Sequence, residues 1–544
     1  MRNSRPIILF PLLCFLSSTI SILCEPNTLV CNQKEKHALL RFKKALSDPD
    51  NRLSSWSVNQ DCCRWEAVRC NNVTGRVVEL HLGYPYDTDY LEFYSKFKLG
   101  GEISPALLEL EFLSYLNLSW NNFGGRPIPS FLGSMGSLRY LDLNHARFAG
   151  LVPHQLGNLS TLRHLDLGYN SGLYVENLGW ISHLAFLKYL SMNSVDLHRE
   201  VHWLEFVSML PSLSELHLSA CELDSNMTSS LGYANFTSLT FLDLSANNFN
   251  QEIPNWLFKL SSLVSLRLIF NQFKGQISES LGQLKYLEYL DVSLNSFHGP
   301  IPTSIGNLSS LRYLRLLGNQ WINGTLPMSL GQLKYLEYLD VSNNFFHGPI
   351  PTSVGNLSSL RHLDLSRNQL INGTLPMSLG QLKYLEYLDV CLNSFHGPIP
   401  TSIGNLSSLS YLDLYDNPIN GTLPMSLGLL SNLEYLYVGW TSLTGTISEV
   451  HFTALSKLKG LSIYGTSLSF HVNSSWTPPF QLEYLEADSC KMGPKFPAWL
   501  QTQKSLFYLD FSRSGIVDTA PNWFWKFASY IEVGCHVCLR MLLR

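Results

Sequence analysis

Four cysteines near the N-terminus, Cys31, Cys62, Cys63 and Cys70, are the residues whose type and spacing most clearly suggest chemistry. In an oxidising compartment, four cysteines within one short segment indicate two disulfides. Zinc is the competing interpretation, but two adjacent cysteines followed by a six-residue gap do not match the usual spacing of paired zinc ligands. We therefore expect disulfides here and no metal site.

The other reactive side chains recur without forming a catalytic group. His298, His347 and His396 each precede a Gly-Pro pair and follow the period of the chain, whereas Cys535 and Cys538 form a lone C-x-x-C, which is weak evidence for redox or metal chemistry. The sequence holds no G-x-S-x-G, no H-E-x-x-H and no phosphate loop ending in Gly-Lys. We therefore predict a protein that is not an enzyme and needs no cofactor.

The composition favours a folded chain of nearly balanced charge. Hydrophobic residues make up 45% of the chain and charged residues 15%, which fits a well-buried core and argues against disorder. Because 38 Lys and Arg nearly cancel 42 Asp and Glu, there is no electrostatic footprint for nucleic acid or for an anionic membrane. We expect neither as a partner.

The first 24 residues are typical of a secretory signal peptide, because Arg2 and Arg5 precede an apolar run from Ile7 to Leu23. A transmembrane anchor is the alternative, although the run barely reaches the ~18 residues that such a helix needs. We expect an extracellular or cell-wall protein with no membrane span after signal removal, or one on the outer face of the plasma membrane if an anchored form exists.

N-glycosylation motifs agree with the secretory pathway only jointly with this leader, because Asn-Leu-Ser and Asn-Gly-Thr also recur with the internal repeat. The predicted acceptors are Asn72, Asn117, Asn158, Asn226, Asn235, Asn307, Asn323, Asn356, Asn372, Asn405, Asn420 and Asn473.

The pattern L-x-x-L-x-L-x-x-N starts at Val77 and recurs about 18 times along the chain, at spacings of 24 to 26 residues from Leu113 to Leu506. This period is typical of leucine-rich repeats. Alternating apolar residues predict a short strand in each unit, followed by a turn and a short helical return. Over residues 77–529 we therefore predict an α/β solenoid: a right-handed leucine-rich-repeat horseshoe or superhelix with one parallel β-sheet on its concave face. The closing Asn of each unit is expected to serve the scaffold.

The N-terminal block CNQKEKHALLRFKKALSDPDNRLSSWSVNQDCCRWEAVRC resembles the cap of plant extracellular leucine-rich-repeat proteins. The L-x-G-x-I-P stretch of the units is likewise similar to the plant repeat type. The most similar class is the receptor-like proteins of the xylanase-receptor and disease-resistance type, which carry an ectodomain but no kinase. The resemblance implies a disulfide cap over residues 25–76, with Cys31 bonded to Cys62 and Cys63 to Cys70.

For function, the resemblance implies an extracellular module that recognises a protein or peptide ligand in plant defence, with membrane receptor kinases as co-receptors. A typical member continues into a non-repeat island, a second cap and a transmembrane helix. The pattern instead dissolves near Tyr530, so residues 530–544 are expected to be a non-repeat tail of a C-terminally truncated form. The alternatives are a soluble inhibitor of microbial wall-degrading enzymes and a truncated decoy or non-functional fragment.

Candidate contact residues are expected at the third, fifth, seventh and eighth positions of each unit, which face the concave side. Tyr at the third position and Asp at the fifth recur too regularly to encode one ligand. Residues that break the pattern are better candidates, because exposed aromatic and Arg side chains often dominate binding energy. Cys391, which replaces Ser293 and Ser342 of related units, is expected to be an outward-facing free thiol. The first cluster of candidates is Arg267, Ile269, Phe270, Arg315 and Leu317, and the second is Arg367, Tyr415, Asp416, Tyr437 and Trp440.

Overall fold

The computed structural model describes residues 30–84, 98–224, 236–319, 321–529 and 532–534. The predicted signal peptide, the acceptors Asn226 and Asn235, and the cysteines Cys535 and Cys538 lie outside the described residues. Within these ranges, no helix combines the length and the apolar character needed to cross a lipid bilayer.

The repeated leucine pattern forms one long parallel sheet, as predicted. In a typical unit, Leu290 points into the core at 1% exposure and pairs in register with Leu266 and Leu314 of the neighbouring strands. At the N-terminal end, β2 joins the sheet antiparallel to β3. The strands of this sheet are β2 (Val68–Cys70), β3 (Val77–His81), β5 (Tyr115–Asn117), β6 (Tyr140–Asp142), β8 (His164–Asp166), β10 (Tyr189–Ser191), β11 (Glu215–His217), β12 (Phe241–Asp243), β13 (Ser265–Arg267), β15 (Tyr289–Asp291), β17 (Tyr313–Arg315), β19 (Tyr338–Asp340), β21 (His362–Asp364), β23 (Tyr387–Asp389), β25 (Tyr411–Asp413), β27 (Tyr435–Tyr437), β29 (Gly460–Ser462), β31 (Tyr484–Glu486), β32 (Tyr508–Asp510) and β33 (Glu532–Gly534).

The closing Asn of each unit ties that unit to the one before it. The side-chain amide of Asn295 donates to the carbonyl oxygens of Val292 (3.1 Å) and of Leu268 in the preceding unit (2.9 Å). Its Oδ1 accepts a hydrogen bond from the backbone N–H of Phe273, also in the preceding unit (2.9 Å). Cys221 takes the same place and donates its Sγ–H to Met192 O at 3.1 Å. The ladder therefore has the scaffold role expected from the sequence.

The L-x-G segments form short strands on a second face, where the sequence predicted only a turn. Gly299 ends one of these strands at φ 78°, a left-handed conformation that glycine adopts without a Cβ penalty. Parallel pairing between units satisfies backbone groups that a simple turn would leave to water. The lateral strands are β4 (Gly100–Gly101), β7 (Ala149–Leu151), β9 (Gly172–Tyr174), β14 (Lys274–Gln276), β16 (Ser296–Gly299), β18 (Trp321–Gly324), β20 (Phe345–Gly348), β22 (Leu370–Gly373), β24 (Ser394–Phe395), β26 (Asn417–Thr422), β28 (Thr441–Ile447) and β30 (Ser467–Phe470). Strand β1 (Leu46–Ser47) of the cap pairs antiparallel with β4.

The return segments are helical, mostly as single 3-10 turns, because each has only about five residues before the next strand begins. The α-helices are α1 (Gln33–Ala45), α2 (Trp203–Ser208) and α3 (Asn522–Ala528). The 3-10 helices are η1 (Cys62–Arg64), η3 (Pro105–Glu109), η4 (Ser130–Ser134), η5 (His154–Asn158), η6 (Gly179–His183), η7 (Leu257–Lys259), η8 (Glu279–Gln283), η9 (Thr303–Asn307), η10 (Met328–Gln332), η11 (Thr352–Asn356), η12 (Met377–Gln381), η13 (Thr401–Asn405), η14 (Met425–Leu429), η15 (Glu449–Phe452) and η16 (Ala498–Thr502).

Helix α1 closes the N-terminal end of the core. The side chain of Asn32 caps the helix by accepting hydrogen bonds from Lys34 N and Glu35 N. Glu35 is fully buried, and its carboxylate accepts from Val77 N (2.8 Å) and Arg76 Nη1 (3.2 Å), which ties the helix to the first strand of the repeats.

The disulfides Cys31–Cys62 and Cys63–Cys70 are both present, which confirms the disulfide cap and the pairing that the resemblance implied.

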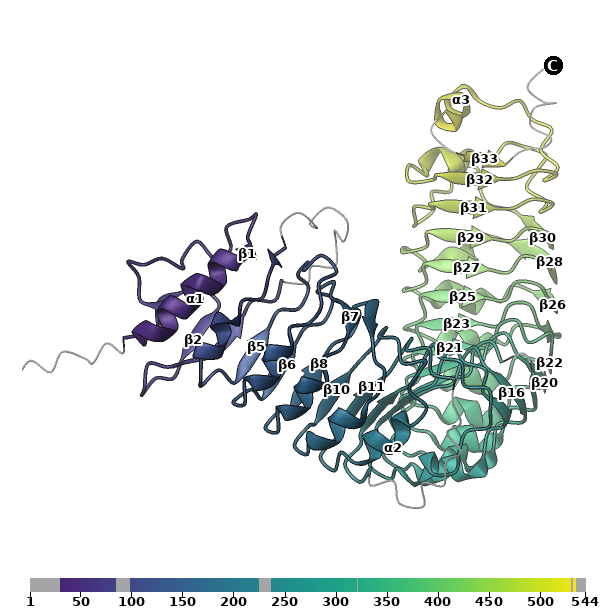
Figure 1. Cartoon of the computed structure of the whole chain (residues 1–544). Coiled ribbons are helices and arrows are strands. Elements are labelled where there is room, and N and C mark those ends of the chain that lie inside the picture. Colours follow the sequence, from purple (N-terminus) through teal and green to yellow (C-terminus); the bar gives the residue numbers. More distant parts are fainter. Residues whose placement is uncertain (1–29, 85–97, 225–235, 320, 530–531, 535–544) are drawn as a thin grey trace, which may run out of the picture.

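Figure 1 shows the array bending between β11 and β21 from a limb that carries α1 to an upright limb that ends near α3. The leucines and the Phe side chains of the lateral strands fill one continuous core along the whole array. At the C-terminal end, β33 pairs in parallel with β32, so strand pairing continues past residue 529, where the leucine pattern ends. The solenoid predicted from the sequence is thus the observed fold class.

Candidate ligand-binding face

The eighth position of each unit projects most strongly from the concave face. Phe270 (φ 60°) and Trp440 (φ 52°) both adopt the left-handed backbone conformation there, as do Arg367 and Asp416. This conformation is uncommon for bulky residues. Here each such residue directly precedes the closing Asn position, which anchors its unit. Phe270 is 65% exposed and Trp440 is 59% exposed. Large apolar side chains are therefore held in solvent by the scaffold itself.

The fifth and seventh positions are largely buried, contrary to the expectation that they form part of an open strip. Asp291 and Asp340 at the fifth position and Ser293 and Ser342 at the seventh are all buried. Neighbouring strands lie only about 4.8 Å apart, so a small side chain is covered by larger ones on either side. The accessible strip is consequently narrower than the sequence suggested.

Cys391 is buried, contrary to the expectation of an outward-facing free thiol. The residue is 8% exposed, its backbone N–H donates to Asp389 Oδ1 (2.9 Å), and burial raises the pKa of the thiol. The related residues Ser293 and Ser342 are buried too. A covered, protonated thiol is inert, so Cys391 is not a dimerisation point.

The third position forms an aromatic ladder that serves the scaffold. Ring centroids are 4.0 Å apart between Tyr338 and His362, 4.1 Å between His362 and Tyr387, and 4.4 Å between Tyr387 and Tyr411, all with stacked planes. Burial lowers the pKa of His362 to about 4, so this imidazole is neutral within the ladder.

The first cluster of candidates centres on two arginines that are already engaged. The guanidinium of Arg267 lies between the rings of Phe241 and Tyr289, at 5.1 and 4.7 Å from their centroids. Arg315 lies 3.5 Å from the carboxylate of Asp291 and 3.8 Å from that of Asp340.

Burial acts to lower the pKa of Arg315, but Asp291 and other neighbours more than compensate, so the pKa lies above its ordinary value. Both arginines therefore contribute to the sheet before any ligand arrives. Ile269 and Leu317 are half-buried beside them, which leaves Phe270 as the projecting member of this cluster.

A run of carboxylates without arginines follows the first cluster. Asp364, Asp389 and Asp413 occupy the fifth position on successive strands and are register partners. Burial, together with the Asp389 carboxylate, raises the pKa of Asp364 and of Asp413 to about 7. Burial also raises the pKa of Asp389 itself. Arg367 acts to lower the pKa of Asp389, but burial outweighs it there and is the largest cause of the raised pKa at all three carboxylates.

The second cluster is a group of aromatic rings packed around glycines. Tyr415 and Tyr464 stack with their centroids 5.7 Å apart, and Trp440 meets Tyr464 edge-on at 6.4 Å. Gly439 makes room for this stack, because a Cβ there would lie 2.8 Å from Tyr464 Cδ1. The sequence analysis missed Tyr464. Gly465 follows Tyr464 in the chain and Gly439 lies beside it in the preceding unit, and these departures from the repeat pattern could have indicated it.

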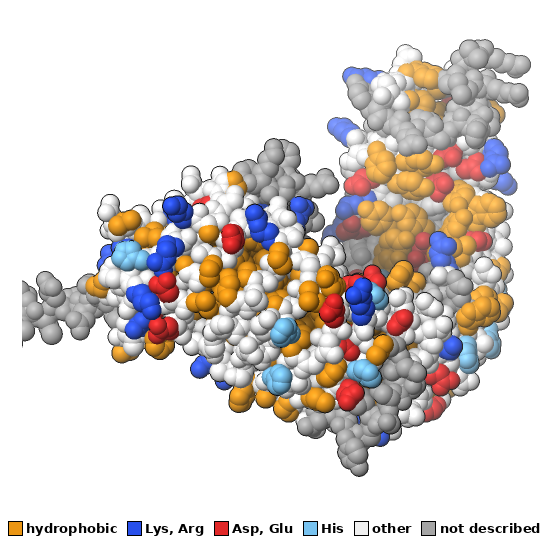
Figure 2. Space-filling model, viewed as in Figure 1, with side chains coloured by type: hydrophobic (Ala, Val, Ile, Leu, Met, Phe, Trp, Pro, Cys, Tyr) orange, Lys and Arg blue, Asp and Glu red, His pale blue; other side chains and the backbone are white. Residues whose placement is uncertain are grey.

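Tyr437 completes the second cluster from the fifth position. Its ring meets Tyr411 at 5.6 Å and Tyr484 at 6.5 Å, in both cases edge-on. Gly460 replaces the usual Tyr of the third position, and a Cβ on it would lie 2.6 Å from Tyr435 Cδ1. The glycine therefore lets the tyrosines of β27 lie across the next strand. Figure 2 shows hydrophobic side chains gathered on this part of the upright limb, over β25 to β31.

The two clusters remain separate on the array. The first lies on β13 to β17 and the second on β21 to β27, so Phe270 and Trp440 are about 34 Å apart along the sheet at ~4.8 Å per strand. The structure places every candidate residue of both clusters on the concave side but does not bring the clusters into one pocket.

A third aromatic group at the eighth position was missed from the sequence. Trp120, His145 and Tyr169 stack in succession, with centroids 3.8 and 4.3 Å apart. Unlike the Tyr of the third position, these residues differ in type from unit to unit, so no period marked them. They extend the aromatic surface to the N-terminal limb.

The glycosylation acceptors leave the concave face largely clear. Asn158, Asn307, Asn356 and Asn405 end return helices on the outer side, and all four are exposed. The acceptors Asn72, Asn323, Asn372, Asn420 and Asn473 are also exposed. Asn117 is the exception, because it lies on β5, is half-buried and accepts hydrogen bonds from Ser119 N (2.9 Å) and Ser119 Oγ (2.7 Å).

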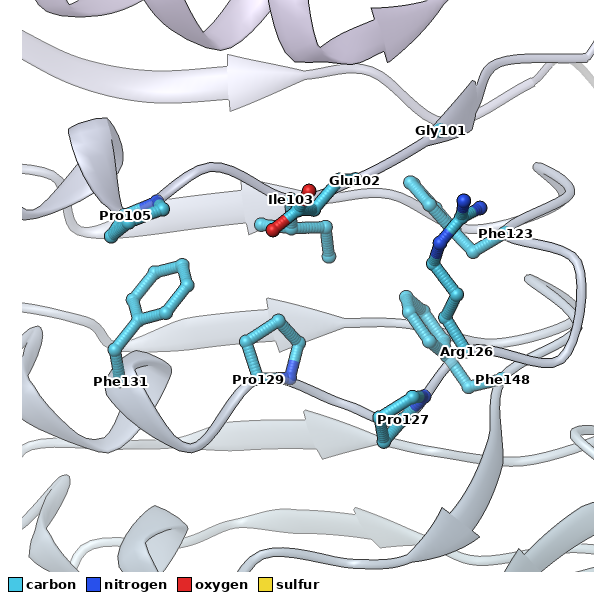
Figure 3. A pocket seen from close by; sticks show the side chains of 10 residues that line it. All are labelled: Gly101, Glu102, Ile103, Pro105, Phe123, Arg126, Pro127, Pro129, Phe131 and Phe148. Atoms are coloured by element: carbon cyan, nitrogen blue, oxygen red, sulfur yellow. The ribbon is translucent and has the colours of Figure 1, made fainter.

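A cavity of about 460 Å³ lies away from this face, between the lateral segments of the first units. Figure 3 shows Pro105 and Phe131 at one end of it, with Ile103 on the opposite side from Pro129. The side chains of Glu102 and Arg126 point in different directions at its edge.

Metal-binding residue types meet at an exposed polar group, Asp196, His198 and Glu222, whose ligand atoms lie within 4.8 Å of one another. His198 and Asp196 already share a hydrogen bond of 2.6 Å, which accounts for their proximity without an ion. A second group combines Asp389 and Asp413 with the protonated thiol of Cys391.

The fold is a leucine-rich-repeat solenoid, and the chain belongs to the leucine-rich-repeat family. The family model described as "Leucine-rich repeat region" matches residues 89–303, 301–396 and 350–514. The model described as "Leucine rich repeat N-terminal domain" matches residues 32–71, which contain Cys62, Cys63 and Cys70 of the disulfide cap.

Within that family, the chain is similar to two receptor-like proteins of Solanum lycopersicum. It is 40% identical to receptor-like protein EIX1 in an alignment of 540 positions that covers 93% of this chain and 52% of the relative. It is 39% identical to receptor-like protein EIX2 in an alignment of 528 positions that covers 92% of this chain and 51% of the relative. The chain thus spans about half the length of the curated relatives it matches.

Among solved structures, the fold is similar to a plant peptide hormone receptor, RGFR1 in complex with RGF2. The TM-score is 0.62 at 24% sequence identity, covering 87% of this chain and 82% of the receptor chain. A pear (Pyrus communis) polygalacturonase inhibitor is 36% identical, but only over 21% of this chain and 37% of the inhibitor. The whole-chain sequence likeness is therefore to the receptor-like proteins rather than to the inhibitor.

Proposed function

We propose that the chain is the extracellular ligand-recognition module of a plant receptor-like protein, which binds a protein or peptide ligand on its concave face. In this proposal the ligand is recognised during plant defence, and membrane receptor kinases act as co-receptors. Such a module works by binding alone and needs no catalytic residues.

The observation that carries the proposal is the presentation of Phe270 and Trp440, two large apolar side chains held in solvent at left-handed positions of the concave face. Exposed aromatic residues in a clear surface are the common anchors of protein interfaces. The half-buried tyrosines Tyr415 and Tyr437 extend the contact area around Trp440. The outer side and the lateral strands, where most of the described acceptor asparagines lie, are left to glycans.

The similarity to receptor-like proteins supports the same proposal. Both Solanum relatives match over more than nine tenths of this chain. The solved plant peptide hormone receptor, RGFR1 in complex with RGF2, supports the fold.

Binding of a purified fungal xylanase to the immobilised full chain tests the proposal, with the secreted proteins of a fungal culture as a second probe. We expect saturable binding that is lost when Phe270 and Trp440 are both changed to Ala. If neither probe binds, or if the double variant binds as well as the original chain, the proposed recognition face is wrong.

A further inference from the structure

Halfway along the concave sheet, the alternation of acidic and basic residues at the fifth position ends. Arg267 is the register partner of Asp243 and Asp291, and Arg315 is the partner of Asp291 and Asp340. Acidic and basic residues therefore alternate across β12 to β19, and each arginine lies between two carboxylates. From β21 onward this alternation stops.

Beyond β19 the concave positions are acidic. In the units that start at Leu360 to Leu482, Arg367 is the one Lys or Arg found at the third, fifth, seventh and eighth positions. His362 is neutral, because burial lowers its pKa to about 4. Asp488 is paired with Arg513 of the following unit. The acidic residues at these positions are Asp364, Asp389, Asp413, Asp416, Glu486 and Asp488.

Aromatic rings lie directly among these carboxylates. Tyr437 is the register partner of Asp413, and Tyr484 Oη donates a hydrogen bond to Glu486 Oε2 at 2.9 Å. Trp440 stands exposed beside Tyr464. A ring face attracts a cation through its quadrupole, and a carboxylate attracts it by charge, so the two features favour the same kind of group.

The first cluster shows how a guanidinium fits such a surface. Arg315 lies 3.5 Å from the carboxylate of Asp291 and 5.6 Å from the ring centroid of Tyr338. Asp413 and Tyr437 offer the same pair of groups on β25 and β27, but no arginine of the chain occupies the place between them within the described residues.

We infer that the concave face from Asp364 to Glu486 binds a basic partner, a protein or peptide segment whose Arg or Lys side chains take the places that Arg267 and Arg315 take in the first cluster. The inference rests on the proposed function and adds to it the charge of the ligand. The acidic excess and the aromatic rings select a cationic segment over an acidic or purely apolar one.

A synthetic deca-arginine peptide tests this inference, with deca-glutamate as the opposite probe and the full glycosylated chain as receptor. Binding is measured by fluorescence anisotropy at ~0.15 M salt, where attraction between distant surface charges is largely screened. We expect deca-arginine to bind and deca-glutamate not to bind. Equal binding of the two peptides, or no binding of deca-arginine, would overturn the inference.

Two double variants with the same loss of charge distinguish binding at this face from general attraction of the peptide to an acidic protein. The first is Asp416→Asn with Glu486→Gln, and the control is Glu102→Gln with Glu252→Gln at exposed sites away from the face. We expect at least tenfold weaker deca-arginine binding for the first and less than twofold for the control. Similar weakening in both would overturn the inference.

Trp440→Ala provides a second readout that does not change the charge. It should weaken deca-arginine binding severalfold, whereas Trp321→Ala, an equally exposed Trp on the lateral strand β18, should not. Unchanged melting temperatures verify that all variants fold. The xylanase experiment reports separately on the proposed function: xylanase binding at this face without deca-arginine binding would refute only the charge assigned to the ligand.

Discussion

Asp389 and Asp413 lie opposite each other as register partners on neighbouring strands, and both are at most 9% exposed. Two buried carboxylates at this spacing destabilise each other's charged form. In the first cluster, an arginine lies between such partners, whereas here none does. This difference divides the concave face into a neutralised part and an acidic part, and it has consequences for stability as well as for binding.

The pH dependence of stability should reveal the acidic run. The pKa of Asp364 and of Asp413 is about 7 in the folded chain, against about 3.9 for an unfolded Asp. Since the folded chain holds these protons more tightly, their contribution to stability is fully present below pH ~4 and is lost as the pH rises through about 7.

His164 and His362 act in the opposite direction at lower pH. Burial lowers the pKa of each to about 4, so they cost stability as the pH falls below about 6.5. Between pH 6.5 and 8 the aspartates should dominate. We expect the free energy of unfolding to fall by about 1 kcal/mol for each of Asp364 and Asp413 over that window.

Urea unfolding at the two pH values measures this loss. Asp413→Asn should reduce the difference between them, while Glu102→Gln at an exposed site should leave it unchanged. A variant Asp413→Asn with the full original pH dependence would show that this carboxylate is not the source.

The asparagine ladder makes a second prediction. Asn295→Ala removes hydrogen bonds to Leu268 O, Val292 O and Ser293 O and leaves the N–H of Phe273 without its acceptor. We expect a loss of about 3 kcal/mol, because buried backbone groups become unsatisfied. Asn295→Cys should cost less, since Cys221 occupies the equivalent place. Equal urea midpoints for the Ala variant and the original chain would contradict the scaffold role.

Gly460 tests the packing of the second cluster. In Gly460→Ala the new Cβ would lie 2.6 Å from Tyr435 Cδ1, so the tyrosine rings of β27 must move. Gly136→Ala is the matched control, because a Cβ there meets nothing within 4 Å. We expect Gly460→Ala to change the near-ultraviolet circular dichroism of the tyrosines and Gly136→Ala to leave it unchanged. Identical spectra for the two variants would show that the rings do not depend on Gly460.

Glycosylation should follow the geometry of the acceptors. Asn307, Asn356 and Asn405 stand exposed at the ends of return helices, whereas Asn117 is half-buried on β5 and bonded to Ser119. Mass spectrometry of glycopeptides from the secreted chain should therefore find high occupancy at the first three sites and the lowest at Asn117. High occupancy at Asn117 would mean that the N-terminal part of the concave face carries a glycan.

The repeat and the cap could be predicted from the sequence because both depend on local patterns. Leu290 and its equivalents recur at a fixed period, and the cysteines of the cap lie close together in the chain. The lateral strands were not predicted, since the segment Ser296–Gly299 forms hydrogen bonds only to other units. The candidate site was predicted as a set of positions, but not as a set of contacts.

Cys391 and Tyr464 show where pattern reasoning fails. Position in the unit indicates which side of the sheet a residue faces, but its exposure depends on the size of the side chains on neighbouring strands. Cys391 faces the concave side and is nevertheless buried. Tyr464 belongs to the second cluster because it stacks on Tyr415 across Gly439, a contact between units that the repeat pattern does not encode.

The central claim, that the concave face recognises the ligand, is tested most directly by comparing two tryptophans of equal exposure. Trp440 is 59% exposed on the concave face, and Trp321 is 62% exposed on the lateral strand β18. The measurement is the dissociation constant of fungal xylanase, or of the component of the fungal culture that binds, for Trp440→Ala and Trp321→Ala.

Truncating a buried interface aromatic typically costs ~2 kcal/mol or more. We therefore expect Trp440→Ala to weaken binding by about thirtyfold and Trp321→Ala to change it by less than twofold. Binding that survives Trp440→Ala but is lost in Trp321→Ala would place recognition on the lateral strands and contradict this account.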